Sequence, residues 1–274
     1  MNLLSRSLTL ILSLLIVVVA CKKDDDKDSN PVNDEGILLK EITHEGEVYT
    51  SLKYDDKDRV IEFFINGHKA SKLYSNIDDD TDFTYKLSYT GNDRLPNTVL
   101  VYGNDNPKFT LRFIEDGEKF IVKYYSPTDK SFDMPFREDT YYINDDDMPK
   151  RSHIKLTVEG LTIIVSETKY TYDGKDLVKV EETYSNDEDV TITEVMLFEY
   201  DDAKNPYHLF HKLAFVIGNP GLGSEYARSK ITEFINDEEI RKEHYTHTKN
   251  ANGYIKTMTV VEPTNTFTLD FAYE

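Results

Sequence analysis

The stretch Tyr170-Thr171-Tyr172-Asp173-Gly174-Lys175-Asp176-Leu177-Val178-Lys179-Val180 reads as one β-hairpin. An arm of aromatic and β-branched residues ends at Tyr172, the predicted turn is Asp173-Gly174, and an apolar alternating arm leaves through Leu177 or Val178. An Asp-Gly pair tolerates the positive φ values of a tight primed turn, and such turns match the right-handed twist of the flanking strands. Variants of this unit recur along most of the chain.

The same succession of strand, turn and strand continues from Ile37 to the end of the chain. Alternation of apolar and polar residues, bounded by clusters of Asn, Asp and Gly, is typical of strands joined in hairpins. The chain closes on Phe267, Leu269, Phe271 and Tyr273, which alternate with a period of two. The other predicted turns lie at residues 55–58, 90–93, 115–117, 144–147, 201–202 and 249–253.

An aromatic residue marks the last strand position before most of these turns. The ring can pack on the pleated face while a tyrosine hydroxyl reaches water or a turn carbonyl. The positions are Tyr54, Tyr89, Phe113, Tyr142, Tyr172 and Tyr200, with spacings of 35, 24, 29, 30 and 28 residues. This loose period suits a unit of two strands with variable loops, stacked so that neighbours bury each other's apolar faces.

We therefore predict an all-β fold, an antiparallel meander of repeated hairpins. Strands adjacent in sequence tend to pair. The pattern predicts one curved sheet or an open barrel, and leaves a sandwich as an alternative. Residues 37–274 are expected to form a single domain, because no Pro- or Ser-rich linker interrupts the hairpins.

One stretch, 206–217, departs from the strand pattern. Asn205 is a suitable N-cap, Pro206 suits a first helical position, and apolar residues follow with helical spacing until Gly218. We predict a short helix that closes one end or one edge of the sheet. Alternation from Leu209 to Phe215 leaves a strand as the alternative.

The composition limits the classes of partner. The chain has 274 residues, of which 39% are hydrophobic, and carries 51 acidic against 32 basic side chains, a net charge of −19. Phosphate binding depends on Lys and Arg, so this balance argues against nucleic acid as a partner. The acidic surface accounts for solubility.

The amino terminus carries an export signal. Residues Leu8 to Ala20 form an apolar run behind the single basic side chain Arg6. The run is shorter than the about 20 residues that a membrane-spanning helix needs, and it fits the apolar region of a signal peptide, residues 1–20. Cys21 is the only cysteine, so no internal disulfide can form.

The residues around Cys21 resemble those of bacterial lipoproteins. Val18-Val19-Ala20-Cys21 is similar to their lipobox, which implies cleavage before Cys21 and acylation of its thiol and amine. The next five residues, Lys22-Lys23-Asp24-Asp25-Asp26, look like the export signal that directs lipoproteins of the Bacteroidota to the outer face of the outer membrane. Residues 21–36 are charged and poor in apolar groups, which predicts a disordered tether. The alternative is a secreted protein whose cysteine falls there by chance.

The hairpins also resemble known repeats. The Tyr-x-Tyr-Asp unit of Tyr170 to Asp173 is similar to the Tyr-Asp hairpins of RHS-type repeat proteins. The lipobox, acidic tether and Tyr-Asp hairpins together resemble a family of uncharacterised lipoproteins of the Bacteroidota. The resemblance implies an all-β fold and brings no known activity.

Three groups of residues could bind a metal, but a structural role explains each of them better. His208 and His211 would share a helix face, but no third ligand is identifiable nearby. His244 and His247 would point to opposite faces of a strand. Three acidic clusters lack the spacing of a calcium loop, and turn chemistry explains them: Asp55-Asp56-Asp58, Asp78-Asp79-Asp80-Asp82 and Asp145-Asp146-Asp147. We expect no metal and no cofactor.

Recognisable catalytic motifs are missing from the sequence. It contains neither Gly-x-Ser-x-Gly nor His-Glu-x-x-His. Our first hypothesis is a non-enzymatic, surface-exposed lipoprotein of the outer membrane that binds a glycan or protein ligand or has a structural role. The alternatives are a carboxylate-based glycan hydrolase, with two facing acids of which one has a raised pKa, and a lipid carrier with an apolar cavity under the 206–217 helix.

Overall fold

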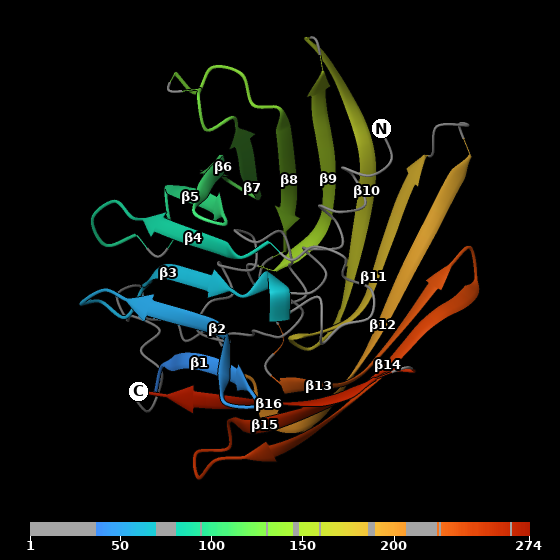
Figure 1. Cartoon of the computed structure of the whole chain (residues 1–274). Helices are drawn as coiled ribbons and strands as arrows, with labels where there is room; N and C mark the ends of the chain where they lie inside the picture. The colour runs from blue at the N-terminus through green and yellow to red at the C-terminus, as the bar shows by residue number, and fades with distance from the viewer. Residues whose placement is uncertain are drawn as a thin grey trace.

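In the described part of the chain, sixteen strands form one closed antiparallel barrel (Figure 1). This computed structural model describes residues 37–69, 81–93, 95–129, 131–144, 148–158, 160–185, 190–206, 224, 226–263 and 265–274. The strands are β1 (Leu39–His44), β2 (Glu47–Tyr54), β3 (Val60–Ile65), β4 (Phe83–Ser88), β5 (Thr98–Gly103), β6 (Asn106–Asp116), β7 (Lys119–Tyr125), β8 (Arg137–Ile143), β9 (Pro149–Val158), β10 (Leu161–Asp173), β11 (Asp176–Ser185), β12 (Thr191–Lys204), β13 (Tyr226–Ile235), β14 (Glu238–Lys249), β15 (Ile255–Val261) and β16 (Thr266–Tyr273).

The predicted all-β meander is confirmed, and the sheet is closed rather than open. Every strand pairs with its neighbours in sequence, and β1 also pairs with β16, with Ile42 opposite Phe271. Leu38 and Glu274 extend this seam, since each backbone N–H donates to the other's carbonyl over 3.0 and 2.9 Å. Among the described residues, no helix is long and apolar enough to span a membrane. The predicted 206–217 helix lies almost entirely outside the described residues.

The two ends of the barrel carry different turns. We call the end where β1 begins and β16 finishes the terminal end, and the other the far end. The predicted turns lie at or after the ends of even-numbered strands and so gather at the terminal end, with one exception. The turn predicted at 201–202 is wrong, because β12 continues through these residues to Lys204 and only its register shifts after Tyr200. At the far end, the two-residue connections Asn104-Asp105 and Asn236-Asp237 consist of residues with positive φ, as in a type I′ turn. A two-strand repeat therefore places its Tyr-Asp turns on one side of the molecule.

The hairpin of Tyr170 to Val180 is present as β10 and β11. Its turn lies one residue later than predicted, because Asp173 pairs with Asp176 and the connection is Gly174-Lys175. Gly174 has a φ of 58°, which fits the first central position of a type II′ turn. Glycine thus occupies the position that an L-residue with a side chain adopts only at a cost.

Tyrosines near the strand ends form hydrogen bonds to neighbouring strands at the terminal end. Each of four hydroxyls donates to a backbone carbonyl at the start of the preceding odd-numbered strand. Tyr54 reaches Leu39 over 2.5 Å, and Tyr89 reaches Val60 over 2.8 Å. Two further bonds of this kind run from Tyr200 to Leu177 and from Tyr273 to Ile255. The hydroxyls therefore satisfy strand carbonyls rather than water.

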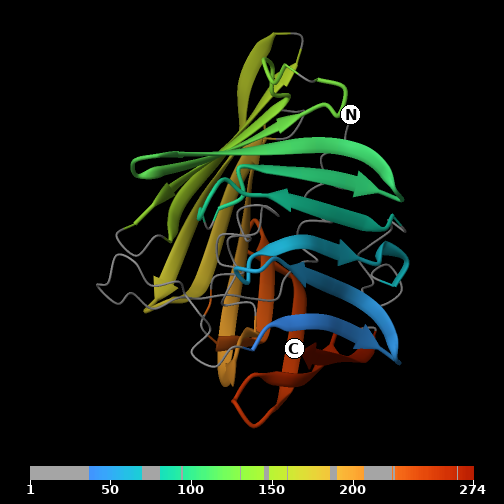
Figure 2. The ribbon, with the colours of Figure 1, turned by 90° about the vertical axis from the view of Figure 1, so that its left-hand side faces the viewer.

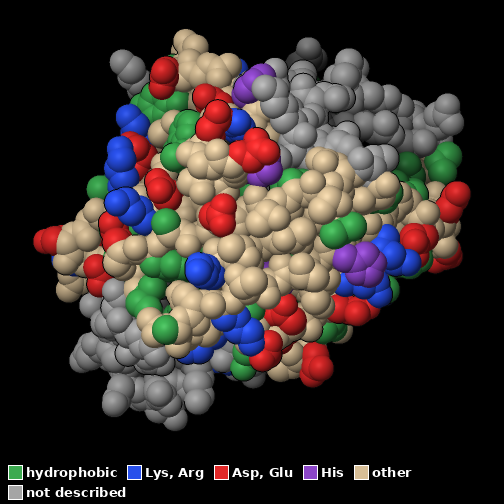
Figure 3. All heavy atoms as spheres, turned by 60° about the horizontal axis from the view of Figure 1, so that its bottom comes forward, with side chains coloured by type: hydrophobic (Ala, Val, Ile, Leu, Met, Phe, Trp, Pro, Cys, Tyr) green, Lys and Arg blue, Asp and Glu red, His purple; other side chains and the backbone are tan. Residues whose placement is uncertain are grey.

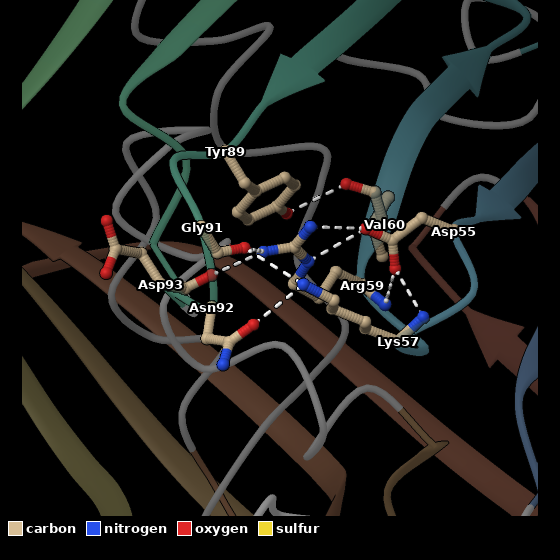
Figure 4. A network of polar contacts seen from close by, with 8 residues as sticks. All are labelled: Asp55, Lys57, Arg59, Val60, Tyr89, Gly91, Asn92 and Asp93. Atoms are coloured by element: carbon tan, nitrogen blue, oxygen red, sulfur yellow. Dashed lines mark hydrogen bonds and ion pairs between the residues drawn. The ribbon is translucent and has the colours of Figure 1, made fainter.

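Adjacent Tyr-Asp turns are also joined to one another (Figure 4). The Asp55 carboxylate accepts hydrogen bonds from the backbone N–H groups of Lys57 and Arg59, over 2.9 and 3.0 Å, and from the Arg59 side chain. The Arg59 guanidinium lies 4.5 Å from the centre of the Tyr89 ring and donates to the Gly91 carbonyl over 3.0 Å. Turn chemistry therefore explains Asp55, as predicted.

The inner wall carries the hydrophobic core. On β16 the side chains of Phe267, Leu269 and Phe271 are buried, while the alternate positions Thr268 and Asp270 are exposed. Inward residues of this kind from β1 to β8 and from β11 to β16 form a single buried cluster. Figure 1 shows that β1–β5 are short, whereas β9–β14 are long and extend toward the far end.

Candidate functional site

The predicted lipid-attachment site and its export signal lie outside the described residues. These are Cys21 and Lys22, Lys23, Asp24, Asp25 and Asp26. The same holds for His208 and His211 and for most of two acidic clusters, 78–80 and 145–147. Their roles stay predictions from the sequence.

The described candidates for metal binding do not form a site. His244 is exposed, whereas the His247 side chain is buried on the inner wall and pairs with Asp201, so the two histidines lie on opposite faces, as predicted. Within the part of the chain that the structure describes, no group of three or more His, Cys, Asp or Glu side chains is placed to hold a metal ion.

Four glutamates face the interior on β11 to β14, near the far end. They were not singled out in the sequence. Each lies two residues from a side chain of the hydrophobic core on the same strand face, as Glu182 does from the buried Val180 and Glu194 from the partly buried Met196. With one arginine, they form what we call the acidic layer: Glu182, Glu194, Glu233, Arg241 and Glu243.

Strand register brings the members of the acidic layer together. Glu182 lies directly opposite Glu194 across β11 and β12, and Glu233 lies opposite Arg241 across β13 and β14. The Arg241 Nε atom is 2.9 Å from a Glu233 carboxylate oxygen and 3.2 Å from one of Glu243. The Tyr245 hydroxyl donates to the other Glu243 oxygen. The ionisable side chains of the acidic layer therefore form a row across four strands of the inner wall.

The acidic layer contains more carboxylates than cations. Burial raises the pKa of Glu194 to about 7, helped by the nearby Glu233 and Glu182 carboxylates. Burial also raises the pKa of Glu182. By contrast, Glu243 and Glu233 raise the pKa of Arg241, against the effect of its own burial. The Glu194 carboxyl is hydrogen-bonded to Glu233, which requires one of the two to hold a proton. The layer can therefore take up protons in the neutral to mildly acidic range.

A second buried polar group on β7 and β8 is satisfied internally. Arg137 donates to both carboxylate oxygens of Asp139, over 2.6 and 2.7 Å, and the Tyr124 hydroxyl donates to the same carboxylate over 2.9 Å. The guanidinium also lies 4.8 Å from the centre of the Tyr124 ring. Because charge and hydrogen bonds are matched within the group, we interpret it as structural.

The acidic layer has one property of a hydrolytic site and lacks another. A carboxyl with a pKa near 7 beside a second carboxylate is the pairing that acid–base hydrolysis uses. In glycosidases, however, the two carboxyls stand about 5–10 Å apart with the substrate between them. Glu194 and Glu233 are instead in hydrogen-bond contact, so the pair resembles a shared proton more than a glycosidase centre.

Comparisons with known proteins assign no family. No family model and no curated protein matches the chain. Among solved structures, the chain is similar to a porin-like protein from Bacteroides vulgatus, with a TM-score of 0.45 and 12% identity over 86% of this chain and 99% of that chain. A porin-like protein from Bacteroides uniformis gives a TM-score of 0.33 and 11% identity over 87% and 96%. Structural similarity at this level supports no conclusion about function.

Proposed function

We propose that this protein is a lipid-anchored protein of the outer membrane whose barrel stands in water at the cell surface and acts as a non-enzymatic binding or structural module. The observation that supports this proposal is the polarity of the outer wall. A barrel that spans a membrane presents lipid with an outward apolar band about 25 Å tall. Here outward positions around the barrel form ion pairs and threonine pairs.

Ion pairs lie on widely separated strands of the outer wall. Lys53 and Glu62 are 2.6 Å apart across β2 and β3, and Glu138 on β8 lies between Lys123 and Lys155 at 3.4 and 3.5 Å. A Lys or Arg at the middle of a lipid-facing wall costs about 2–4 kcal/mol. Such pairs are expected where the wall faces water.

Threonines cover the wall near β14 to β16. Thr248 and Thr257 share a hydrogen bond of 2.7 Å, and Thr259 and Thr268 one of 2.9 Å. Figure 3 views the molecule from this side and shows Lys, Arg, Asp and Glu side chains scattered among uncharged polar ones and backbone, with hydrophobic side chains only in small groups. A water-exposed barrel needs a separate attachment, which Cys21 and the tether of residues 21–36 would provide.

Membrane extraction of a Cys21→Ser variant tests the attachment. We expect the wild-type protein to stay with the outer membrane after a carbonate wash and the variant to be released, with Ser13→Ala as a matched control within the leader. Mass spectrometry of the wild-type amino-terminal peptide should show acylation of Cys21. A variant that has lost residues 1–20 and still stays in the washed outer membrane would contradict the proposal, because the barrel itself would then be embedded.

Protease treatment of intact cells tests the surface location. We expect wild-type barrel to be cleaved, and a variant with alanine at positions 22–26 to be protected while still acylated. Asn33→Ala is the control in the same tether. Equal protection of wild type and variant would contradict the export signal.

The ligand is expected to be a glycan or a protein. Binding without turnover predicts a rise in melting temperature with a glycan or peptide and no product in the same mixture. Flat melting curves across a broad panel would favour the structural role.

A carboxylate-based hydrolase is the second candidate, and it rests on the raised pKa of Glu194 beside Glu233. Glycan hydrolysis that is lost in Glu194→Gln but kept in Glu199→Gln, an outer-wall variant, would favour it. The lipid carrier has less support, because the described inward side chains pack into one buried cluster.

A further inference from the structure

The hairpin of β9 and β10 projects beyond its neighbours at the far end. The last residue of β9 paired with β8 is Leu156, and the first residue of β10 paired with β11 is Ser166. The residues beyond these pairs include four large aliphatic side chains. Their exposed fractions are 55% for Val158, 74% for Leu161, 55% for Ile163 and 58% for Ile164. We call these four residues the apolar tip.

Two further apolar side chains lie next to the apolar tip. The Phe136 carbonyl accepts a hydrogen bond of 3.0 Å from Thr157 of β9, which places Phe136 beside the hairpin. Phe136 is 40% exposed and Met134, two residues earlier, is 66% exposed. Single exposed apolar residues are common, but a group on one projecting element marks an interaction site.

The outer wall behind the tip is basic, although the chain carries a net charge of −19. Ile164 of the tip lies directly opposite Lys155, which in turn shares Glu138 with Lys123. On β6 to β10 the outward cationic side chains are Arg112, Lys119, Lys123, Arg151, Lys155 and Lys169. The outward acidic side chains on the same strands are Asp116, Glu138, Glu167 and Asp173. This part of the wall therefore has an excess of positive charge.

The cations of this wall also affect the pKa of His153. His153 lies between Arg151 and Lys155 on β9, and burial followed by these two cations lowers its pKa. We call the outward side chains of β6 to β10 the basic wall. It runs toward the apolar tip, which Figures 1 and 2 both show at the upper extreme of the molecule, away from the C-terminus.

We propose that the apolar tip inserts into the surface of an anionic lipid bilayer while the cations of the basic wall nearest the tip, Lys155 and Lys123, contact the lipid headgroups. Ile164 lies on the cationic face of the hairpin, and Val158, Leu161 and Ile163 lie on the opposite face. End-on insertion would bury the aliphatic side chains of both faces among acyl chains and leave the adjoining cations at the negatively charged headgroups. An anionic polysaccharide would satisfy the basic wall but offers nothing to bury Leu161 and Ile163. The lipid surface accounts for both features.

The proposed tether permits this contact on the anchoring membrane, and in this respect the inference rests on the proposed function. Sixteen residues lie from Cys21 to Gly36. Fully extended, they span about 55 Å, whereas the thirteen residues of β10 span about 43 Å. The far end can therefore reach the bilayer that holds the lipid on Cys21.

Vesicle binding by unlipidated protein tests the proposal independently of Cys21. Every strand of the barrel lies between Leu39 and Tyr273, so a chain of residues 22–274 contains the whole barrel. We expect it to co-sediment with vesicles of phosphatidylglycerol and phosphatidylcholine, and at least tenfold more weakly with phosphatidylcholine alone. Leu161→Ser combined with Ile163→Ser should weaken binding at least tenfold, with an unchanged melting temperature. Ile61→Ser, an exposed apolar site on β3, should have no effect.

Depth of insertion gives a second measurement. The chain has no tryptophan, so Leu161→Trp introduces a single reporter. We expect brominated lipids to quench its fluorescence at least threefold more than that of Ile61→Trp. Lys123→Gln combined with Lys155→Gln should reduce the salt dependence of binding, whereas Lys53→Gln should not.

Three results would overturn the proposal. They are no binding to anionic vesicles at low salt, equal quenching of the two tryptophans, and a concentration-dependent dimer that disappears in the tip variant without any vesicle binding. The last result would assign the apolar tip to self-association. None of them bears on acylation of Cys21, which is measured on the full chain.

Discussion

The inner wall of β15, β16 and β1 to β7 differs from that of β8 to β14. The first region has mostly apolar inward positions, such as Val99 and Leu111, and its strands are short except β6. The strands of the second region are longer except β8, and its wall near the far end carries buried charges, from Asp139 on β8 to Glu243 on β14. One closed sheet therefore joins an apolar core to a polar interior, and the two regions should respond differently to substitution.

The largest effect is expected from Asp139→Ala in the polar region. The substitution leaves the buried Arg137 guanidinium without its bidentate partner, and breaking a buried pair in this way costs about 3–5 kcal/mol. Urea denaturation measures the loss. Glu62→Ala, in an exposed pair with Lys53, should cost less than about 1 kcal/mol. Similar losses of stability in the two variants would contradict the prediction that breaking the Arg137–Asp139 pair costs more than breaking a pair at the surface.

A double replacement refines the same comparison. Arg137→Met with Asp139→Leu removes both charges and should recover most of the stability lost in Asp139→Ala, because paired removal leaves no unsatisfied ion. A double variant as unstable as Asp139→Ala would show that the cost does not come from the unpaired charge of Arg137 alone.

In the apolar region, Leu269→Ala should cost about 2–5 kcal/mol, because it deletes buried methyl groups and leaves a cavity. Thr268→Ala, the adjacent outward position, should change the free energy of unfolding by less than about 1 kcal/mol. Both are measured by urea denaturation at pH 7. Equal losses would mean that Leu269 is not part of a packed wall.

Glu194→Gln should change how stability depends on pH. The folded pKa of about 7 lies above the ordinary glutamate value of 4.5, so the folded state holds the proton more tightly than the unfolded state. Wild-type stability should therefore fall as the pH rises from about 4.5 to 7 and then level off, by about 1–3 kcal/mol from this group. Glutamine cannot ionise, so the variant should show a smaller fall.

Melting temperatures from pH 4.5 to 8 measure this effect. Glu199→Gln, on the outer wall of the same strand, is the matched control and should follow the wild-type curve. A Glu194→Gln curve parallel to that of wild type would contradict the buried, protonated state.

The smallest effect is expected from the tyrosine hydroxyls at the terminal end. Tyr89→Phe removes one hydrogen bond to the Val60 carbonyl and keeps the ring, so it should cost about 1 kcal/mol. Tyr102→Phe, whose ring lies 5.1 Å from the Lys86 ammonium on the outer wall, should cost less. Equal costs would mean that the bond to Val60 adds little.

The apolar region could be predicted from the sequence and the polar interior could not. Alternation marks Phe267, Leu269 and Phe271 without reference to the rest of the chain, and Tyr-Asp turns mark where strands end. Neither signal shows that β1 returns to β16, because closure depends on the summed twist of all the strands. The sequence therefore left an open sheet, a barrel and a sandwich as alternatives.

Two neighbouring glutamates show why the acidic layer was missed. Glu181 faces outward, where hydrogen bonding and charge from Lys179 lower the pKa of its carboxyl. Glu182 faces inward, where burial raises its pKa. The residue type is the same, and only the strand register assigns each to its face. In a chain with 51 acidic residues, composition cannot separate the two.

The seam between β1 and β16 has a consequence for the order of assembly. β1 finds its second partner only in β16, so the wall cannot close until the polypeptide is available through Tyr273. A product that stops before Thr266 would leave both β1 and β15 with open edges, which are prone to pair with other chains. The barrel therefore closes only once β16 has been synthesised, and a shorter product is expected to aggregate or to be degraded.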